Sequence, residues 1–262
     1  MCNRYALSKK QERFILQEYE TLDLYFMDRF NIAPTQSAPV VLVENGKLVS
    51  REMQWGFIPQ WSKSPVTNAQ FETLDKKRLF KEAFETRRCL VPASGFYEWQ
   101  DFGNRKQPIL FLLNDGRTFF FAGLYSAKLE SFVIITAAAN SFVGKIHNRM
   151  PLILSPGDYS PWLSPESQQY KAVRPTAEEM KTYWVSDRMN SSRNADPEAA
   201  KPITASVKSV FGGYSLPDGL PEGSIVKIRA FDAGCYDVEF DGKVFNVSQV
   251  CVSFKGETGA LL

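Results

Sequence analysis

Short, mostly apolar runs separated by polar and turn residues occur along much of the chain, a pattern typical of β-strands. The runs are Val40–Val43, Lys47–Gln54, Pro108–Leu113, Thr118–Leu124 and Phe132–Ala138. Asn45-Gly46 and Asp115-Gly116 lie between such runs, and these dipeptides favour tight turns. We therefore expect a protein built mainly of hairpin-connected strands.

Two segments have helical spacing instead. Asp75–Arg87 places Leu79, Phe80, Ala83 and Phe84 on one face and charged residues on the other, which predicts an amphipathic helix. Lys9–Tyr19 follows Ser8, a suitable N-cap, and we expect a helix there as well. The polar stretch 157–202 is compatible with one or two short helices, so the pattern predicts mostly short strands with a few helices.

The last fifty residues look separate from the rest. Ser215–Gly223 is rich in proline and glycine, as linkers are. Beyond it, the strand-like runs are Ser224–Phe231, Tyr236–Phe240 and Lys243–Val247, with Asp241-Gly242 as a tight turn. We expect a main domain at 1–213, a linker at 214–223 and a small β module at 224–262. That module could be an SH3-like barrel or a β appendage packed on the main domain.

Composition excludes several kinds of site. The 262 residues include one histidine and four cysteines, and 44% are hydrophobic, enough for a globular core. A zinc site with two or three histidines is impossible, and the cysteines at 2, 89, 235 and 251 have no CxxC spacing. We see neither a membrane-spanning apolar stretch nor a secretion signal, and the few cysteines favour a reducing, intracellular location such as the cytoplasm or nucleoid.

Charge is unevenly distributed along the chain. The net charge is +2, but residues 1–213 hold 27 Lys and Arg against 22 Asp and Glu, while residues 214–262 hold 4 against 7. A strongly basic surface for nucleic acid is absent, so any nucleic-acid site must be a local patch in the first 213 residues.

Cys2 is the first candidate for chemistry. Removal of Met1 would expose a cysteine with both a thiol and a free α-amine, whose pKa near 8 leaves much of it neutral at physiological pH. Such a 1,2-aminothiol attacks an aldehyde through the amine to give an imine, and the thiol then closes a thiazolidine ring. A cysteine that is second by accident is the commoner case.

His147 and Glu98 are candidate acid/base groups. His147 follows a strand-like run and precedes Pro151 by four residues, a loop position where catalytic groups often lie. Glu98 lies between aromatic residues in Gly95–Trp99, where desolvation would raise its pKa. A partly buried histidine without a function and an edge-strand glutamate facing water are the alternatives.

Asn68 and Trp61 are weaker candidates. Asn68 could donate and accept hydrogen bonds in a pocket, or be a turn residue. Trp61, in a loop containing glycine and proline, would stack on a base if exposed or belong to the core if buried.

Eight motifs occur together and in a fixed order. They are Met1–Arg4, Arg29–Thr35, Trp55–Pro59, Asn68-Ala69 with Glu72-Thr73, Arg88–Pro92, Gly95–Trp99, Thr136–Ala138 and His147–Pro151. In this order they resemble the SOS response-associated peptidase (SRAP) family. The resemblance runs from Cys2 to about Ile203 and does not cover residues 214–262.

The resemblance implies an α+β fold of coiled β-sheets with a barrel-like centre and flanking helices. It implies a monomeric enzyme without metal or organic cofactor that forms a covalent crosslink with abasic sites in single-stranded DNA and shields them. Cys2 would be the nucleophile, and Asn68 would hold the Cys2 end and the opened sugar. Glu98 would be the acid/base during imine formation and ring closure, and His147 would be the acid/base on the deoxyribose, promoting its opening to the aldehyde and later crosslink reversal. Positions expected to contact DNA are occupied by Arg4, Pro34, Trp61, Gln70, Arg78, Thr136 and Arg149.

Other function classes remain open on the sequence. Cys2, Glu98 and His147 would equally serve a thiol peptidase or an enzyme that removes its own Met1. Alternatively, the chain could be a non-catalytic binding module that recruits a protein partner through residues 224–262.

Two positions depart from the resemblance. The family usually has glycine where this chain has Asn3, and often has arginine where it has Gln70. A side chain at Asn3 could change access to the nucleophile, and Gln70 lacks one charge for phosphate.

We predict that Gln70→Arg steepens the salt dependence of single-stranded DNA binding by about one unit of log–log slope, because each added cation at a phosphate releases about one counterion. Titrations at several salt concentrations measure this slope, and equal slopes for the two proteins would refute the prediction.

Overall fold

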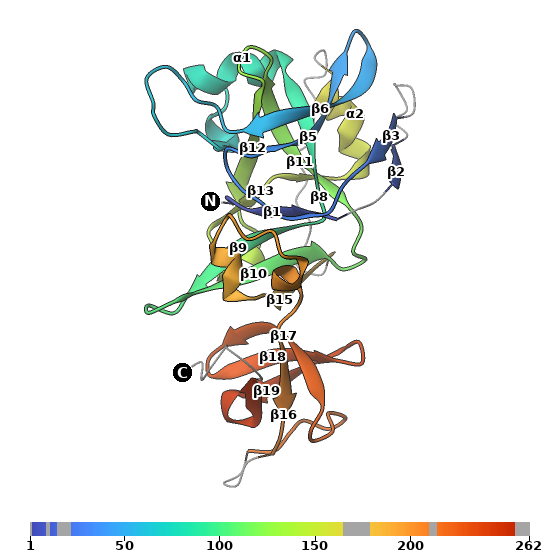
Figure 1. Cartoon of the computed structure of the whole chain (residues 1–262), viewed down its shortest axis with the longest axis vertical. Coiled ribbons are helices and arrows are strands. Elements are labelled where there is room, and N and C mark those ends of the chain that lie inside the picture. The colour runs from blue at the N-terminus through green and yellow to red at the C-terminus, as the bar shows by residue number, and fades with distance from the viewer. Residues whose placement is uncertain (1, 9–10, 15–21, 165–178, 210–213, 255–262) are drawn as a thin grey trace. The chain divides into compact units, whose positions relative to one another are not determined.

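The computed structural model describes residues 2–8, 11–14, 22–164, 179–209 and 214–254, and consists mostly of β-sheet with few helices (Figure 1). This composition is compatible with the predicted α+β class. The chain divides into two compact units, of which the first comprises Met1–Glu98 and Leu112–Met180 and the second comprises Trp99–Phe111 and Lys181–Leu262.

The first unit contains most of the strands and both α-helices of the described residues. Its strands are β1 (Tyr5–Leu7), β2 (Gln11–Phe14), β3 (Leu22–Tyr25), β4 (Arg29–Ile32), β5 (Ser37–Glu44), β6 (Lys47–Trp55), β7 (Asn68–Gln70), β8 (Arg88–Ala93), β11 (Phe119–Ser126), β12 (Ser131–Ala138), β13 (Arg149–Pro151) and β14 (Ile153–Leu154), together with the first residues of β9 (Gly95–Asp101). Its helices are α1 (Arg78–Thr86), α2 (Tyr159–Leu163) and the 3-10 helices η1 (Phe71–Thr73), η2 (Val143–Lys145) and η3 (Pro156–Asp158).

An eight-stranded sheet forms the centre of this unit. Its strands follow the order β13-β12-β6-β5-β8-β11-β14, and β7 pairs with β12. Because β12 also pairs with β11, the pairings β12–β6–β5–β8–β11 form a closed circuit. The barrel-like centre implied by the resemblance stays a prediction. Large apolar side chains are fully buried here, including Trp55, Phe121 and Phe132.

Helix α1 confirms the predicted amphipathic segment, although it begins at Arg78 rather than Asp75. Phe80 and Ala83 are buried, and the Phe80 ring lies 6.3 Å from that of Phe57. The helix begins later because the amides of Lys76 and Lys77 close a turn onto the Thr73 carbonyl. No helix in the described part of the chain is long and apolar enough to span a membrane.

Two local predictions were wrong. Residues 11–14 form strand β2, not a helix, and pair with β3 in antiparallel register; the rest of Lys9–Tyr19 lies outside the described residues. Three adjacent apolar residues at 14–16 do not repeat at helical spacing, so pairing with β3 decides the local structure. Asp115-Gly116 does form a turn, but β10 (Lys106–Leu113) and β11 belong to different sheets, so it closes no hairpin.

The other predicted turns are tight hairpins. Asn45 and Gly46 have φ angles of 50° and 74°, and Asp241 and Gly242 have 48° and 73°. Positive φ at both central residues is the type I′ geometry, whose twist matches that of the flanking strands.

The second unit holds a five-stranded antiparallel sheet in the order β19-β18-β17-β16-β20. Its strands are β16 (Thr204–Val207), β17 (Ile225–Asp232), β18 (Cys235–Phe240), β19 (Lys243–Ser248) and β20 (Val252–Phe254), and the unit also holds most of β10 and β15 (Met180–Trp184) and the 3-10 helices η5 (Asp187–Asn190), η6 (Pro197–Ala200) and η7 (Gln249–Cys251). The rings of Phe102, Trp184, Phe231 and Tyr236 pack against one another as its aromatic core.

Strand β16 precedes the segment that we predicted as a linker. It pairs with β17 and β20, both of which follow that segment. Residues 204–207 and the predicted 224–262 module therefore share one sheet, while independent domains at 1–213 and 224–262 and the SH3-like form of the module stay predictions.

Gly123 is a close-contact position in β11. A Cβ there would lie 2.8 Å from Val91 Cγ2, 2.9 Å from Cys89 Sγ and 3.3 Å from the Val133 carbonyl oxygen. We expect Gly123→Ala to lower the free energy of unfolding by about 1–3 kcal/mol through overpacking. Gly144→Ala is the matched control, since a Cβ there meets nothing within 4 Å. Denaturant unfolding measures both variants, and equal midpoints would contradict this packing.

Candidate active site

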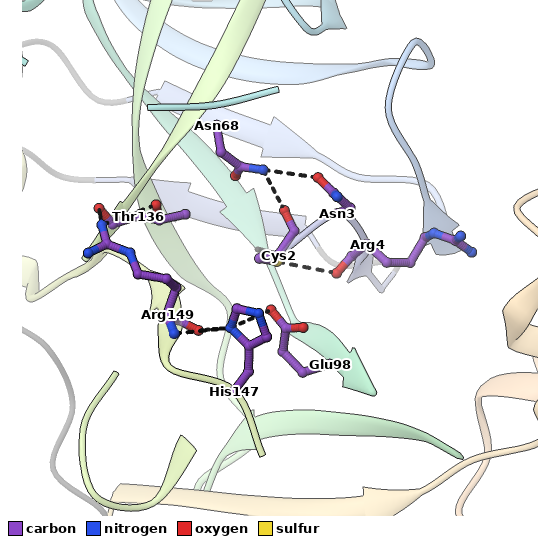
Figure 2. A network of polar contacts seen from close by, with 8 residues as sticks. All are labelled: Cys2, Asn3, Arg4, Asn68, Glu98, Thr136, His147 and Arg149. Carbon is purple, nitrogen blue, oxygen red and sulfur yellow. Dashed lines mark hydrogen bonds and ion pairs between the residues drawn. The ribbon is translucent and has the colours of Figure 1, made fainter. Parts of the chain in front are cut away.

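Cys2 is placed by the pairing of β1 with β9. Tyr5 lies opposite Phe96 in antiparallel register, and the Tyr97 amide donates to the Arg4 carbonyl at 3.0 Å. This register brings the residues before Tyr5 alongside those after Phe96, so Cys2 lies near Glu98 (Figure 2). Cys2 is fully buried, and its thiol lies 3.5 Å from the Arg4 carbonyl oxygen.

Asn68 holds Cys2 from the other side. It begins β7, which runs parallel to β12 with Asn68 opposite Ile134. Its side-chain Nδ2 donates to the Cys2 carbonyl oxygen at 3.0 Å (Figure 2). Asn68 is 8% exposed, and its Oδ1 is buried without a hydrogen-bond partner in the described part of the chain.

Glu98 is a buried carboxyl group beside Cys2. It is 3% exposed, and burial raises its pKa from the ordinary value of 4.5 to about 7. Its Oε1 accepts no hydrogen bond within the described residues and lies 4.0 Å from His147 Nδ1. Burial and then the charge of Glu98 raise the pKa of the Cys2 thiol, so that thiol is protonated at neutral pH.

His147 lies between η2 and β13, in a loop as the sequence predicted. Its Nδ1 lies 3.0 Å from both the amide nitrogen and the carbonyl oxygen of Arg149, so it accepts from the amide in one tautomer and donates to the carbonyl in the other. Its side chain is 28% exposed, against 4% for Glu98. The imidazole is thus oriented by the backbone and is more accessible from outside than the carboxyl group.

Arg149 and Thr136 form a second polar group beside His147 (Figure 2). Ala138 of β12 pairs with Arg149 of β13, and the Arg149 guanidinium donates to the Thr136 carbonyl oxygen at 2.6 Å. The same guanidinium makes a bidentate ion pair with Glu72, at 2.8 and 2.9 Å. Arg149 is therefore rigidly held, with much of its charge balanced by Glu72.

The remaining residues that the sequence predicted as DNA contacts differ in their burial and in their partners. Arg4 donates to the Asn31 side chain at 2.5 Å, and its partial burial lowers the pKa of its guanidinium group. Gln70 is the last residue of β7. Pro34 is half-buried in the loop after β4. Trp61 is 75% exposed, which excludes the alternative that it belongs to the core. Arg78 is exposed at the start of α1, so the structure does not join it or Trp61 to the hydrogen-bonded network.

Three residues of the network were missed as contacts by sequence reasoning. Asn3 and Thr67 hydrogen-bond to Asn68, and Glu72 holds Arg149. Two of these residues could have been found from the sequence, because Glu72 belongs to a matched motif and Asn3 replaces the glycine that is usual in the family. Thr67 gave no such signal. In the described part of the chain, no group of three or more His, Cys, Asp or Glu side chains could hold a metal ion.

Known proteins with similar sequences carry related names. The chain is 30% identical to the abasic site processing protein YoqW of Bacillus subtilis, over 76% of this chain and 98% of that protein. It is 32% identical to the abasic site processing protein YedK of Escherichia coli, over 63% of this chain and 81% of that protein.

Solved structures share the fold. A phage-related protein from Bordetella bronchiseptica matches with a TM-score of 0.60 and 26% identity, over 70% of this chain and 94% of that one.

The family comparison agrees with these relatives. The family model described as SOS response associated peptidase (SRAP) matches residues 1–192, which include Cys2, Asn68, Glu98, His147 and Arg149. The resemblance seen in the eight motifs is thereby confirmed, and this chain belongs to the SRAP family.

Proposed function

We propose that this chain processes abasic sites in single-stranded DNA by forming a covalent thiazolidine crosslink through Cys2. One observation carries the proposal: Cys2 is buried between Asn68 and Glu98, with His147 beside Glu98. Relatives named abasic site processing proteins support the same substrate. The chemistry requires that Met1 is removed, because only then does Cys2 carry a free α-amine.

The proposed reaction has two bond-forming steps. The neutral α-amine attacks the aldehyde carbon of the ring-opened abasic sugar, and the carbinolamine loses water to give an imine. The Cys2 sulfur then adds to the imine carbon while its proton passes to the imine nitrogen, which closes the five-membered ring. Water is the only product released, and no oxidant or cofactor is needed.

The protonation states at the site favour this order of steps. The Cys2 thiol has a raised pKa and is a poor first nucleophile, whereas an α-amine has an ordinary pKa near 8 and is partly neutral at physiological pH. Glu98, with a pKa of about 7, can donate a proton to the departing water and later accept one. The amine therefore attacks first and the thiol second.

His147 and Arg149 have supporting roles in the proposal. The more exposed His147, oriented by the backbone of Arg149, acts as acid/base on the sugar and promotes opening of the ring to the aldehyde. Arg149, held by Thr136 and Glu72, presents a fixed cation for a DNA phosphate. Single-stranded DNA suits a site of this modest charge, with the exposed Trp61 available for stacking.

The alternatives receive less support from the geometry. A thiol peptidase needs a thiolate, and the buried Cys2 thiol has its pKa raised, not lowered. Recruitment of a protein partner through residues 224–262, a monomeric state and self-removal of Met1 stay proposals. The five-stranded sheet of the second unit also shows that removal of residues 214–262 would strip β16 of both neighbouring strands.

We expect intact-mass measurement to show that the mature protein lacks Met1 and gains the mass of an abasic single-stranded oligonucleotide less one water. Cys2→Ser keeps the amine but cannot close the thiazolidine, so its adduct should survive only when borohydride reduces the imine. Cys89→Ser is the matched control, because Cys89 is a second fully buried cysteine. A stable unreduced adduct with Cys2→Ser would refute the proposal.

Glu98→Gln is expected to raise stability while lowering activity. Between pH 4.5 and about 7 the folded state keeps a proton on Glu98 that the unfolded state loses, so stability falls as the pH rises through this window. The variant should exceed the parent in free energy of unfolding by about 3 kcal/mol near pH 8 and match it near pH 4. Its crosslinking rate should fall by about 100-fold or more.

Urea unfolding at both pH values and single-turnover crosslinking measure these effects. Glu44→Gln is the control, since the exposed Glu44 pairs with Arg51 away from the site. A Glu98→Gln protein with the parent's crosslinking rate, or with no stability difference between the two pH values, would contradict the role of Glu98.

A further inference from the structure

The Asn68 amide is surrounded by more acceptors than it has hydrogens. Its Nδ2 lies 3.0 Å from the Cys2 carbonyl oxygen, 3.0 Å from Asn3 Oδ1 and 3.1 Å from Thr67 Oγ1 (Figure 2). An amide nitrogen carries two hydrogens, so two of these contacts can be satisfied at one time. One of the three neighbouring oxygens must therefore form its hydrogen bond with a different partner.

Thr67 resolves this excess by donating to Asn3. Its hydroxyl lies 3.0 Å from Asn3 Oδ1, which accepts from both Thr67 and Asn68. The two hydrogens of Asn68 are then directed at the Cys2 carbonyl oxygen and Asn3 Oδ1, two atoms that can only accept. A rotated Asn68 amide would place oxygen against oxygen at both positions.

These two hydrogen bonds fix the direction in which Asn68 Oδ1, the oxygen of the same amide, points. Asn68 Oδ1 is buried and accepts no hydrogen bond among the described residues, so it is left to receive a donor supplied by the reaction. The free α-amine of mature Cys2 and a hydroxyl group of the opened sugar are such donors. An unpaired buried acceptor costs free energy, and the restraint from Asn3 keeps it in place.

We propose that Asn3 is a positioning residue for the crosslinking reaction, which acts by locking the Asn68 amide with its Oδ1 toward the reacting groups. The inference rests on the proposed function and extends it to a residue next to the nucleophile. With glycine at this position, Thr67 would be the remaining side-chain partner of Asn68 Nδ2, next to the Cys2 carbonyl oxygen. A threonine hydroxyl can donate or accept, so it restrains the orientation of the amide less than an oxygen that only accepts.

The test compares Asn3→Ala with Asn3→Asp in single-turnover crosslinking at saturating abasic single-stranded DNA. Asn3→Ala removes the acceptor, and we expect the rate to fall about 3- to 10-fold, the worth of one ordinary hydrogen bond. Asn3→Asp keeps an acceptor oxygen and should recover most of that loss near pH 9, where the α-amine is neutral. Its carboxylate should also shift the pH profile upward by favouring the charged amine.

Two further measurements separate positioning from other roles. In an Asn68→Ala background, Asn3→Ala should cause no additional loss, because its effect passes through Asn68. Affinity for single-stranded DNA with a stable, unreactive abasic analogue should be the same for Asn3→Ala and the parent. Intact mass confirms removal of Met1 in each variant, and thermal unfolding confirms the fold.

Each outcome bears on one proposal. Equal crosslinking rates for Asn3→Ala and the parent, an Asn3→Asp rate as low as that of Asn3→Ala, or additive losses with Asn68→Ala would overturn the role of Asn3. A loss confined to DNA affinity would also overturn it and make Asn3 a DNA contact. If the parent forms no stable adduct, the proposed function itself fails.

Discussion

The antiparallel pairing of β1 with β9 is the contact on which the site depends. It draws the first residues of the chain into the protein, so Cys2 is fully buried and lies close to Glu98. Without this pairing Cys2 would be exposed to solvent, where burial would no longer raise the pKa of its thiol. Strand pairing therefore sets the electrostatics of the site as well as its position.

Burial raises the pKa of both the Cys2 thiol and the Glu98 carboxyl group, with a different consequence for each. It keeps the Cys2 thiol protonated and brings Glu98 to a pKa of about 7, where a carboxyl group can both donate and accept a proton at neutral pH. The carboxylate form of Glu98 is penalised in the folded state, so the group suited to proton transfer also lowers stability. Such a trade between stability and function is expected at a catalytic position.

Charge at the periphery of the site is arranged differently. Arg149 is held by Glu72 and Thr136, which limits the free charge that it offers but fixes its direction. Gln70 adds no charge to β7. A rigid but weakly cationic group of residues is consistent with the near-balanced charge composition of the chain.

The sequence alone determined the type of protein to a large extent. Apolar runs identified most of the longer strands, such as β5, β6, β11 and β12. The spacing of Leu79, Phe80, Ala83 and Phe84 identified α1, and ordered motifs identified the family. These features are local or are carried by residue identity, so they survive without coordinates. The helix expected at Lys9–Tyr19 failed at residues 11–14 because pairing with a distant strand outweighed a weak local pattern.

Only the tertiary structure decided which atoms meet in the site. Asn3, Thr67 and Asn68 come together because β1 and β7 are placed in the same unit by different partner strands, and no spacing in the sequence encodes that meeting. The burial of Cys2 and Glu98 and the ion pair of Arg149 with Glu72 likewise arise from contacts between residues far apart in the chain. Residue types fixed the available chemistry, whereas hydrogen-bond direction and burial, which depend on three-dimensional neighbours, decided how it is arranged.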